Sequence, residues 1–176
     1  MAARLGIPHV STGEMFRYHV STGTELGRRV DAIMATGEYV PDSITVEMLA
    51  QRIGAPDARN GFILDGFPRT LPQVEALDEL LGAQGLDGVV LFVVDEDELA
   101  SRLLERGRAD DSIETIRNRF QVYRAQTEPI LELYNERDLV IEVDGMGDVD
   151  EVTDRLLDVI AGSQVSSAAG NPESSQ

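Results

Sequence analysis

The stretch NGFILDGFPRTLPQ, residues 60–73, carries the most structural information in the chain. Its apolar run predicts a short strand that ends at Asp65, and ligands bind at the carboxyl ends of strands in open α/β sheets. Gly66 allows a ligand to approach the backbone, and Pro68 fixes the turn from which Arg69 projects. A guanidinium offers a planar fork of donors that suits phosphate oxygens. The same residues also fit a tight turn with a surface arginine, so this stretch alone leaves both interpretations open.

Short apolar runs alternate with longer amphipathic stretches on both sides of this segment. This alternation predicts an α/β fold with a parallel sheet. Expected strands cover residues 6–10, 61–64, 88–94 and 139–143. Expected helices cover residues 12–22, 25–36, 41–53, 71–81, 95–106, 113–136 and 149–161. The run 88–94 lacks alternation, which is typical of a strand buried on both faces. Pro129 is expected to kink or interrupt the long helix.

The composition suits one globular domain of 176 residues with a net charge of −17. Such an acidic chain does not attract nucleic acid through its general field, so any phosphate must be bound by local arginine clusters. All 15 basic residues are arginine, which fits a GC-rich genome or a salt-adapted protein. Cysteine is absent, which excludes thiolate metal sites. No apolar run approaches the roughly 20 residues of a membrane span, so we expect a cytoplasmic chain without membrane partners.

A second arginine-rich stretch follows the third expected strand. Arg102 and Arg106 are four residues apart and share one helix face. Arg108 lies just beyond that helix, before the acidic pair at 110–111, and Arg119 lies on the next helix. Arginines in an acidic chain often form surface ion pairs that contribute little to stability. However, arginines that leave separate elements are also what convergent phosphate binding requires.

The sequence resembles the adenylate kinases in three features together: the run Asp65-Gly-Phe-Pro-Arg-Thr70, the run Ser11-Thr-Gly13, and Arg17. The resemblance extends from residue 1 to about residue 160. It implies a P-loop-kinase-like three-layer fold and a cytoplasmic monomer that converts ATP and AMP to two ADP. ATP would bring Mg²⁺, and no zinc is expected. Thr12 and Gln73 favour AMP over the alternative of a UMP or CMP kinase.

The resemblance also implies a role for each matching residue. The domain would cover residues 1–161, with a nucleoside-monophosphate segment at 11–40, a short lid loop at 106–112 and a disordered tail at 162–176. The AMP site would comprise Thr12, Arg17, Glu38, Tyr39, Val40, Gly66, Phe67, Pro68, Arg69, Gln73, Arg108 and Arg119. Arg102, Arg106 and Gly147 would bind ATP. The catalytic arginines would be Arg69, Arg106, Arg108 and Arg119. Asp65 and Glu14 would lie near the Mg²⁺ and its water shell.

The sequence departs from the family at its start. The family opens with an apolar strand and a glycine-rich loop whose lysine and backbone N–H groups bind the ATP phosphates. These 176 residues contain no lysine and no such loop. The family's first strand lies between the strands that match residues 61–64 and 88–94, so its loss would leave two unpaired edges. We favour a misassigned start, with a protein about 20–25 residues longer, by comparison with the family's loop–helix unit. The alternative is a catalytically impaired remnant that binds AMP.

Overall fold

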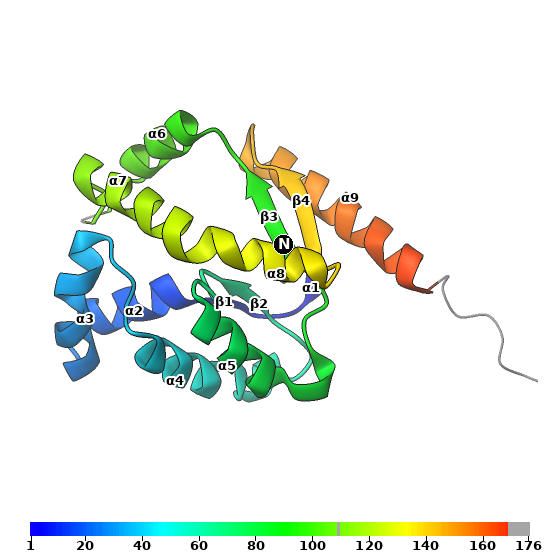
Figure 1. The fold of residues 1–176 in the computed structure, drawn as a ribbon, viewed down its shortest axis with the longest axis horizontal. Coiled ribbons are helices and arrows are strands. Elements are labelled where there is room, and N and C mark those ends of the chain that lie inside the picture. Colours follow the sequence, from blue (N-terminus) through cyan, green and yellow to red (C-terminus); the bar gives the residue numbers. More distant parts are fainter. Residues whose placement is uncertain (109, 169–176) are drawn as a thin grey trace, which may run out of the picture.

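The computed structural model describes residues 1–108 and 110–168, which form an α/β fold (Figure 1). The strands are β1 (His9–Ser11), β2 (Ile63–Asp65), β3 (Val89–Val93) and β4 (Val140–Asp144). The first helices are α1 (Ala2–Leu5), α2 (Thr12–Ser21), α3 (Glu25–Thr36), α4 (Asp42–Ile53) and α5 (Leu71–Leu81). The later helices are α6 (Glu96–Arg106), α7 (Ile113–Val122), α8 (Glu128–Glu136) and α9 (Val149–Ala168). The predicted order of strands and helices is therefore confirmed.

The strands form two separate pairs. β1 pairs in parallel with β2, and β3 pairs in parallel with β4. Within the described part of the chain, β2 and β3 are not hydrogen-bonded to each other. The two unpaired edges expected from the resemblance are thus present.

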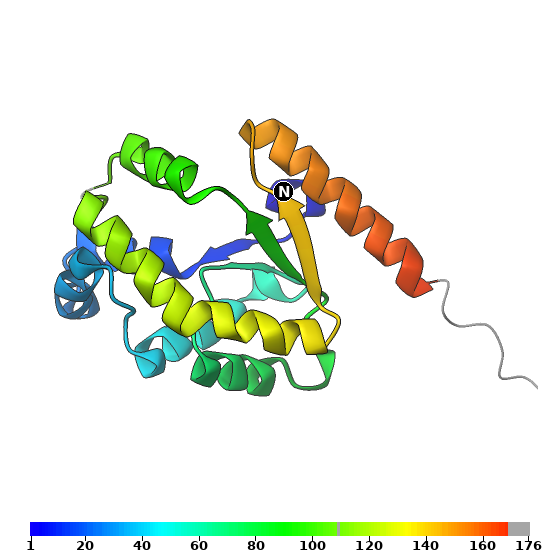
Figure 2. The same cartoon turned by 45° about the horizontal axis from the view of Figure 1, so that its top comes forward.

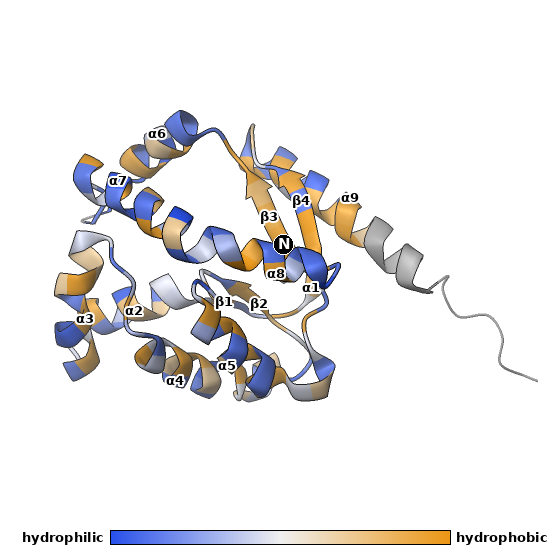
Figure 3. Ribbon diagram, viewed as in Figure 1, coloured by the Kyte–Doolittle hydropathy of each residue, from blue (hydrophilic) through white to orange (hydrophobic). Residues whose placement is uncertain are grey.

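The burial expected for β3 is wrong along the whole strand, since Val89 to Leu91 are only partly buried and the last two residues are exposed. The run is apolar throughout (Figure 3), yet Phe92 is 46% exposed and Val93 is 53% exposed. Strand side chains point to the two faces of the sheet, so this exposure means that helices do not cover both faces of β3 at its carboxyl end.

The last helix runs further than predicted. α9 lies beside β4 in two views (Figures 1 and 2) and continues to Ala168, past the expected boundary at 161. Adding residues to an existing helix is much easier than nucleating one, and the segment 162–168 contains no proline. The expected disordered tail is therefore wrong for residues 162–168, and its remainder lies outside the described residues.

The long helix expected at 113–136 is interrupted just before Pro129. α7 ends at Val122, a π-helical turn covers Tyr123–Thr127, and α8 starts at Glu128. The N–H of Glu128 donates to the carbonyl of Tyr123, five residues back, which is the π pattern. Pro129 has no N–H to donate and sits in the first turn of α8, where none is needed.

Buried side chains fix the segments that surround the carboxyl ends of β1 and β2. Val10 of β1 packs with Leu49 of α4, Leu77 of α5 and Phe67. Burying each such side chain stabilises the fold by about 1.5–3 kcal/mol. A second cluster joins α2, α3 and α4 through Phe16, Val30, Val40 and Met48. Both clusters hold the loops after the strands in place.

Across residues 1–108 and 110–168, no helix combines the length and apolar character needed to cross a lipid bilayer.

Candidate functional site

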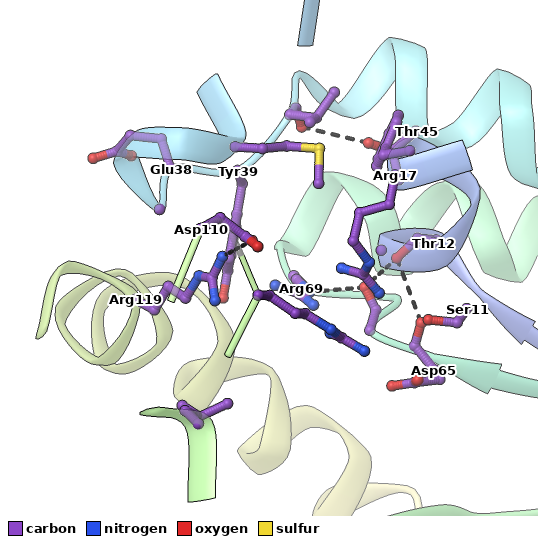
Figure 4. Close-up of a pocket in the computed structure, with 18 of the residues that line it drawn as sticks. Ser11, Thr12, Arg17, Glu38, Tyr39, Thr45, Asp65, Arg69, Asp110 and Arg119 are labelled. Carbon is purple, nitrogen blue, oxygen red and sulfur yellow. Dashed lines mark hydrogen bonds and ion pairs between the residues drawn. The ribbon is translucent and has the colours of Figure 1, made fainter. Parts of the chain in front are cut away.

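A cavity of ≈ 300 Å³ lies at the carboxyl ends of β1 and β2 (Figure 4). Its walls come from α2, the α3–α4 connection, the loop after β2 and the stretch from α6 to α7. The residues that line it are Ser11, Thr12, Gly13, Phe16, Arg17, Met34, Gly37, Glu38, Tyr39, Val40, Thr45, Asp65, Gly66, Arg69, Gln73, Leu103, Arg106, Arg108, Asp110 and Arg119. Five of these side chains are arginines and three are carboxylates, so the cavity wall carries a net positive charge although the chain is acidic.

The start of α2 ties the two strands together. Ser11 caps the helix by accepting the N–H of Glu14. The Thr12 hydroxyl donates to the carbonyl of Gly66 over 3.0 Å, which links α2 to the loop after β2. A side chain at Gly13 would come within 3.1 Å of the Arg17 guanidinium, so glycine lets that guanidinium lie against the backbone.

Arg69 is oriented by contacts on both its backbone and its side chain. Its N–H donates to the Gln73 side chain over 2.8 Å, and its Nε donates to the Gly66 carbonyl over 2.8 Å. The guanidinium carbon lies 5.0 Å from the centre of the Tyr39 ring. The two terminal nitrogens donate no hydrogen bond to any described residue, and Figure 4 shows Arg69 and Arg17 pointing toward the same region. Arg69 therefore presents its outer donors to the cavity.

Arg17 and Arg108 are the least engaged arginines of the site. Neither side chain donates a hydrogen bond to a residue in the described ranges. Burial, followed by the positive charge of Arg108, lowers the pKa of Arg17. A guanidinium stays protonated despite such a shift. Burial is the larger cause, and the repulsion from Arg108 adds to it, so an anion bound between the two guanidinium groups would offset that repulsion.

Arg106 and Arg119, in contrast, are bound by two carboxylates. Arg106 binds Asp111 through two hydrogen bonds of 2.9 and 2.7 Å, and Arg119 binds the same carboxylate over 3.1 Å. Arg119 also contacts Asp110 (Figure 4). The Asp111 side chain is fully buried. Burial alone would raise the pKa of Asp111, but hydrogen bonds from Arg106, from the Arg108 N–H and from Arg119 lower it overall.

The structure brings most of the predicted site residues to one cavity. Those lining it are Thr12, Arg17, Glu38, Tyr39, Val40, Asp65, Gly66, Arg69, Gln73, Arg106, Arg108 and Arg119. Arg102 lies elsewhere: it donates to the carbonyls of Gly145 and Gly147 and to Glu98. Arg102 and Gly147 are thus adjacent, as their shared predicted role requires.

Besides Arg102 and Gly147, three predicted residues do not line the cavity. Phe67 is 6% exposed and belongs to the core, because its ring fills the space between β1, α4 and α5. Pro68 does not contribute to the cavity wall. Glu14 lines a separate surface hollow with Met15, Tyr18 and His19, because it faces away on α2. Phe67 and Pro68 therefore shape the loop that presents Gly66 and Arg69.

Sequence reasoning missed several residues of the wall. Phe16, Met34, Thr45 and Leu103 supply apolar or hydroxyl surface, and Asp110 adds a carboxylate. The sequence did indicate Asp110, because it belongs to the acidic pair that follows Arg108. The apolar residues carry no such signal, since helical spacing places them equally well in the core.

No group of three or more His, Cys, Asp or Glu residues in the described ranges is arranged to bind a metal ion.

An arginine-lined cavity at the carboxyl ends of parallel strands is typical of α/β proteins that bind phosphate-bearing ligands. Comparison with known proteins gives the family. A model described as "Adenylate kinase" matches residues 1–139. The chain therefore belongs to the adenylate kinase family.

Named relatives agree with this assignment. The adenylate kinase of Leifsonia xyli is 49% identical over 175 residues, which cover 96% of this chain and 88% of the relative. The adenylate kinase of Nocardioides sp. is 51% identical over 169 residues, covering 91% and 88%. The adenylate kinase of Thermobifida fusca is 50% identical over 163 residues, covering 89% and 86%.

Proposed function

We propose that the cavity is the AMP site of an ATP:AMP phosphotransferase, which converts ATP and AMP to two ADP. One observation supports the assignment of the AMP site to this cavity. Arg17, Arg69 and Arg108 come from three separate segments and line one space with guanidinium donors that no described residue accepts from. Phosphate oxygens match such donors in charge and geometry. The phosphate of AMP is the natural ligand for this cluster.

The recognition of adenine is proposed to use the part of the wall that adjoins Arg69. The Gln73 side chain accepts from the Arg69 N–H and donates to Asp42 over 2.7 Å. An amide nitrogen carries two hydrogens, so one donor of Gln73 stays available for a base nitrogen. Thr12, Gly66 and Val40 complete this part of the wall. A pyrimidine would leave part of the same surface uncovered.

The remaining arginines fit the transfer step. Phosphoryl transfer depends mainly on positioning and on neutralising charge, and it needs little covalent chemistry from the protein. Arg106 ends α6, Arg108 follows it and Arg119 lies on α7, and all three line the same cavity as Arg17 and Arg69. They are proposed to bind the transferred phosphoryl group. Closing this segment over the nucleotides would also exclude water and suppress hydrolysis.

The ATP side is proposed to use Arg102 and Gly147. Arg102 fixes the loop after β4 by binding the carbonyls of Gly145 and Gly147, so its guanidinium plane lies where that loop begins. Adenylate kinases use ATP together with Mg²⁺, which supplies charge neutralisation for the phosphates. Asp65 lies at the cavity wall and fits a contact with the water shell of that ion, whereas Glu14 does not.

Titration of the 176-residue chain with AMP, UMP and CMP by calorimetry tests the assignment. We expect AMP to bind with the highest affinity, because the wall offers hydrogen-bond partners for adenine. Preferential binding of UMP or CMP would overturn the adenylate assignment. Equal affinity for AMP and adenosine would overturn the phosphate role of the arginines.

A further inference from the structure

Thr127, the last residue of the π-helical turn, connects two walls of the cavity without lining it. Its Oγ1 lies 2.9 Å from the Arg69 carbonyl oxygen and 2.8 Å from the Tyr39 hydroxyl. A carbonyl can only accept, and a threonine hydroxyl has one proton. Thr127 therefore donates to Arg69, and the Tyr39 hydroxyl must donate to Thr127. The three groups form a directed chain of two hydrogen bonds.

The π-helical turn is what places this hydroxyl. The turn Tyr123–Thr127 contains one residue more than an α-turn would, because Glu128 donates to the carbonyl of Tyr123. Thr127 then precedes the first residue of α8, with a φ of −100° that departs from helical values. Single π-turns inside helices often occur at functional sites. Here the turn directs a side chain toward the backbone of the loop after β2.

The contact fixes the residue that presents donors to the cavity. The N–H of Arg69 is bound by Gln73, and its carbonyl is bound by Thr127. The Arg69 guanidinium packs over the ring of Tyr39, whose hydroxyl ends the same chain. The backbone of Arg69 and the surface beneath its side chain are thus both set by Thr127.

We propose that Thr127 is a positioning residue for phosphate binding. Its hydroxyl couples the α3–α4 connection, through Tyr39, to the orientation of Arg69. This inference rests on the proposed AMP site, since it assigns Thr127 to that site's phosphate arginine. A purely structural role would affect stability and all ligands equally, whereas a positioning role affects the phosphate of AMP selectively.

The test is the replacement Thr127→Val, which keeps the β-branched shape and removes the hydroxyl. AMP affinity should fall roughly tenfold, the effect of losing about one hydrogen bond's free energy. Adenosine affinity should stay unchanged, because adenosine has no phosphate for Arg69 to bind. Thr127→Ser should restore AMP affinity. Thr22→Val is the matched control, since the Thr22 hydroxyl is exposed and bonds to Tyr18 and His19 within α2.

A second variant tests the direction of the chain. Tyr39→Phe removes the hydroxyl that donates to Thr127, and it should weaken AMP binding less than Thr127→Val does. Combining both replacements should weaken AMP binding no further than Thr127→Val alone, because the two groups act in series.

The outcomes separate this inference from the proposed function. If the unsubstituted chain binds AMP no better than adenosine, the phosphate site itself is wrong, and the role of Thr127 falls with it. If that chain prefers AMP and Thr127→Val retains the preference, only the inference is wrong. An equal loss of affinity for AMP and adenosine would also overturn it, because that pattern indicates general disruption.

Discussion

Replacing Arg69 with alanine gives the most direct measurement of the phosphate site. The side chain uses Nε on the Gly66 carbonyl and keeps both terminal nitrogens for the cavity. Each hydrogen bond to a charged group contributes about 1.5–3 kcal/mol, and two bonds to one phosphate do not add fully. We therefore expect Arg69→Ala to weaken AMP binding by about 2–4 kcal/mol. That range corresponds to a roughly 30- to 900-fold rise in Kd.

The assay is calorimetric titration with AMP and with adenosine. Arg69→Lys keeps the charge but loses the planar fork and the contact with Tyr39, so its affinity for AMP should fall between those of the parent and Arg69→Ala. Arg59→Ala is the matched control, since Arg59 is exposed and does not line the cavity. Adenosine affinity should change little in every variant. Unaltered AMP affinity in Arg69→Ala would remove this residue from the site and refute the reasoning.

Three further predictions concern the lid-side network, the loop glycine and the core. Asp111→Asn leaves Arg106 and Arg119 without their shared charge and should lower the free energy of unfolding by about 1–3 kcal/mol in urea titrations. Because the pKa of Asp111 is lowered in the folded state, its ionised carboxylate stabilises the fold fully above the ordinary pKa of about 4, and this stabilisation is lost as the pH falls below that value. The unfolding free energies of parent and variant should therefore converge in acid. Asp57→Asn, at an exposed carboxylate, is the control and should barely move the urea midpoint. Gly66→Ala should weaken AMP binding, because at a φ of +74° the new Cβ would lie 2.6 Å from the Arg69 Nη2. Gly6→Ala is the control: Gly6 has a similar φ of +67° but open space around it, so AMP binding should stay unaltered. Tyr134→Phe should leave the melting temperature equal or higher, because the buried hydroxyl has no hydrogen-bond partner among the described residues. Burial raises the pKa of Tyr134 to about 12, so the parent should lose stability relative to Tyr134→Phe as the pH rises above about 10, and parallel loss in both would contradict this account.

The order of elements was predictable because each local pattern agrees with its environment. The apolar runs end at glycine, proline or capping residues. The side chains of Ser11, Thr24, Thr70 and Asp95 each accept a backbone N–H in the first turn of the helix that follows, as N-cap residues commonly do. Burial in β3 was not predictable from its own residues. It depends on whether helices cover both faces of the strand, and hydrophobic periodicity carries no information on that cover.

The candidate site was predictable as a set of arginines but not as a set of contacts. The motif around Arg69 and the repeated arginines after β3 identify residues that could bind phosphate. Which guanidinium groups are engaged depends on pairs distant in the chain, such as Thr127 with Arg69. The wide turn that places Thr127 was also missed, because proline predicts an interruption and does not specify its geometry.

The division between engaged and unengaged arginines suggests how binding and transfer are separated. Among residues 1–108 and 110–168, no carboxylate binds the guanidinium donors of Arg17, Arg69 or Arg108, so a phosphate can bind these arginines without first displacing one. Arg119 contacts Asp110 and Asp111, and the Asp110 carboxylate lines the same cavity. A phosphoryl group that recruits Arg119 must therefore exchange with Asp110, and the net gain is the difference between two charge-assisted interactions. Such an exchange is favourable only when the ligand carries more charge than a single carboxylate, as nucleotides do during transfer. Under the proposed function, the first three arginines would determine the affinity for AMP, and the carboxylate-bound pair would respond to the added charge of the second nucleotide.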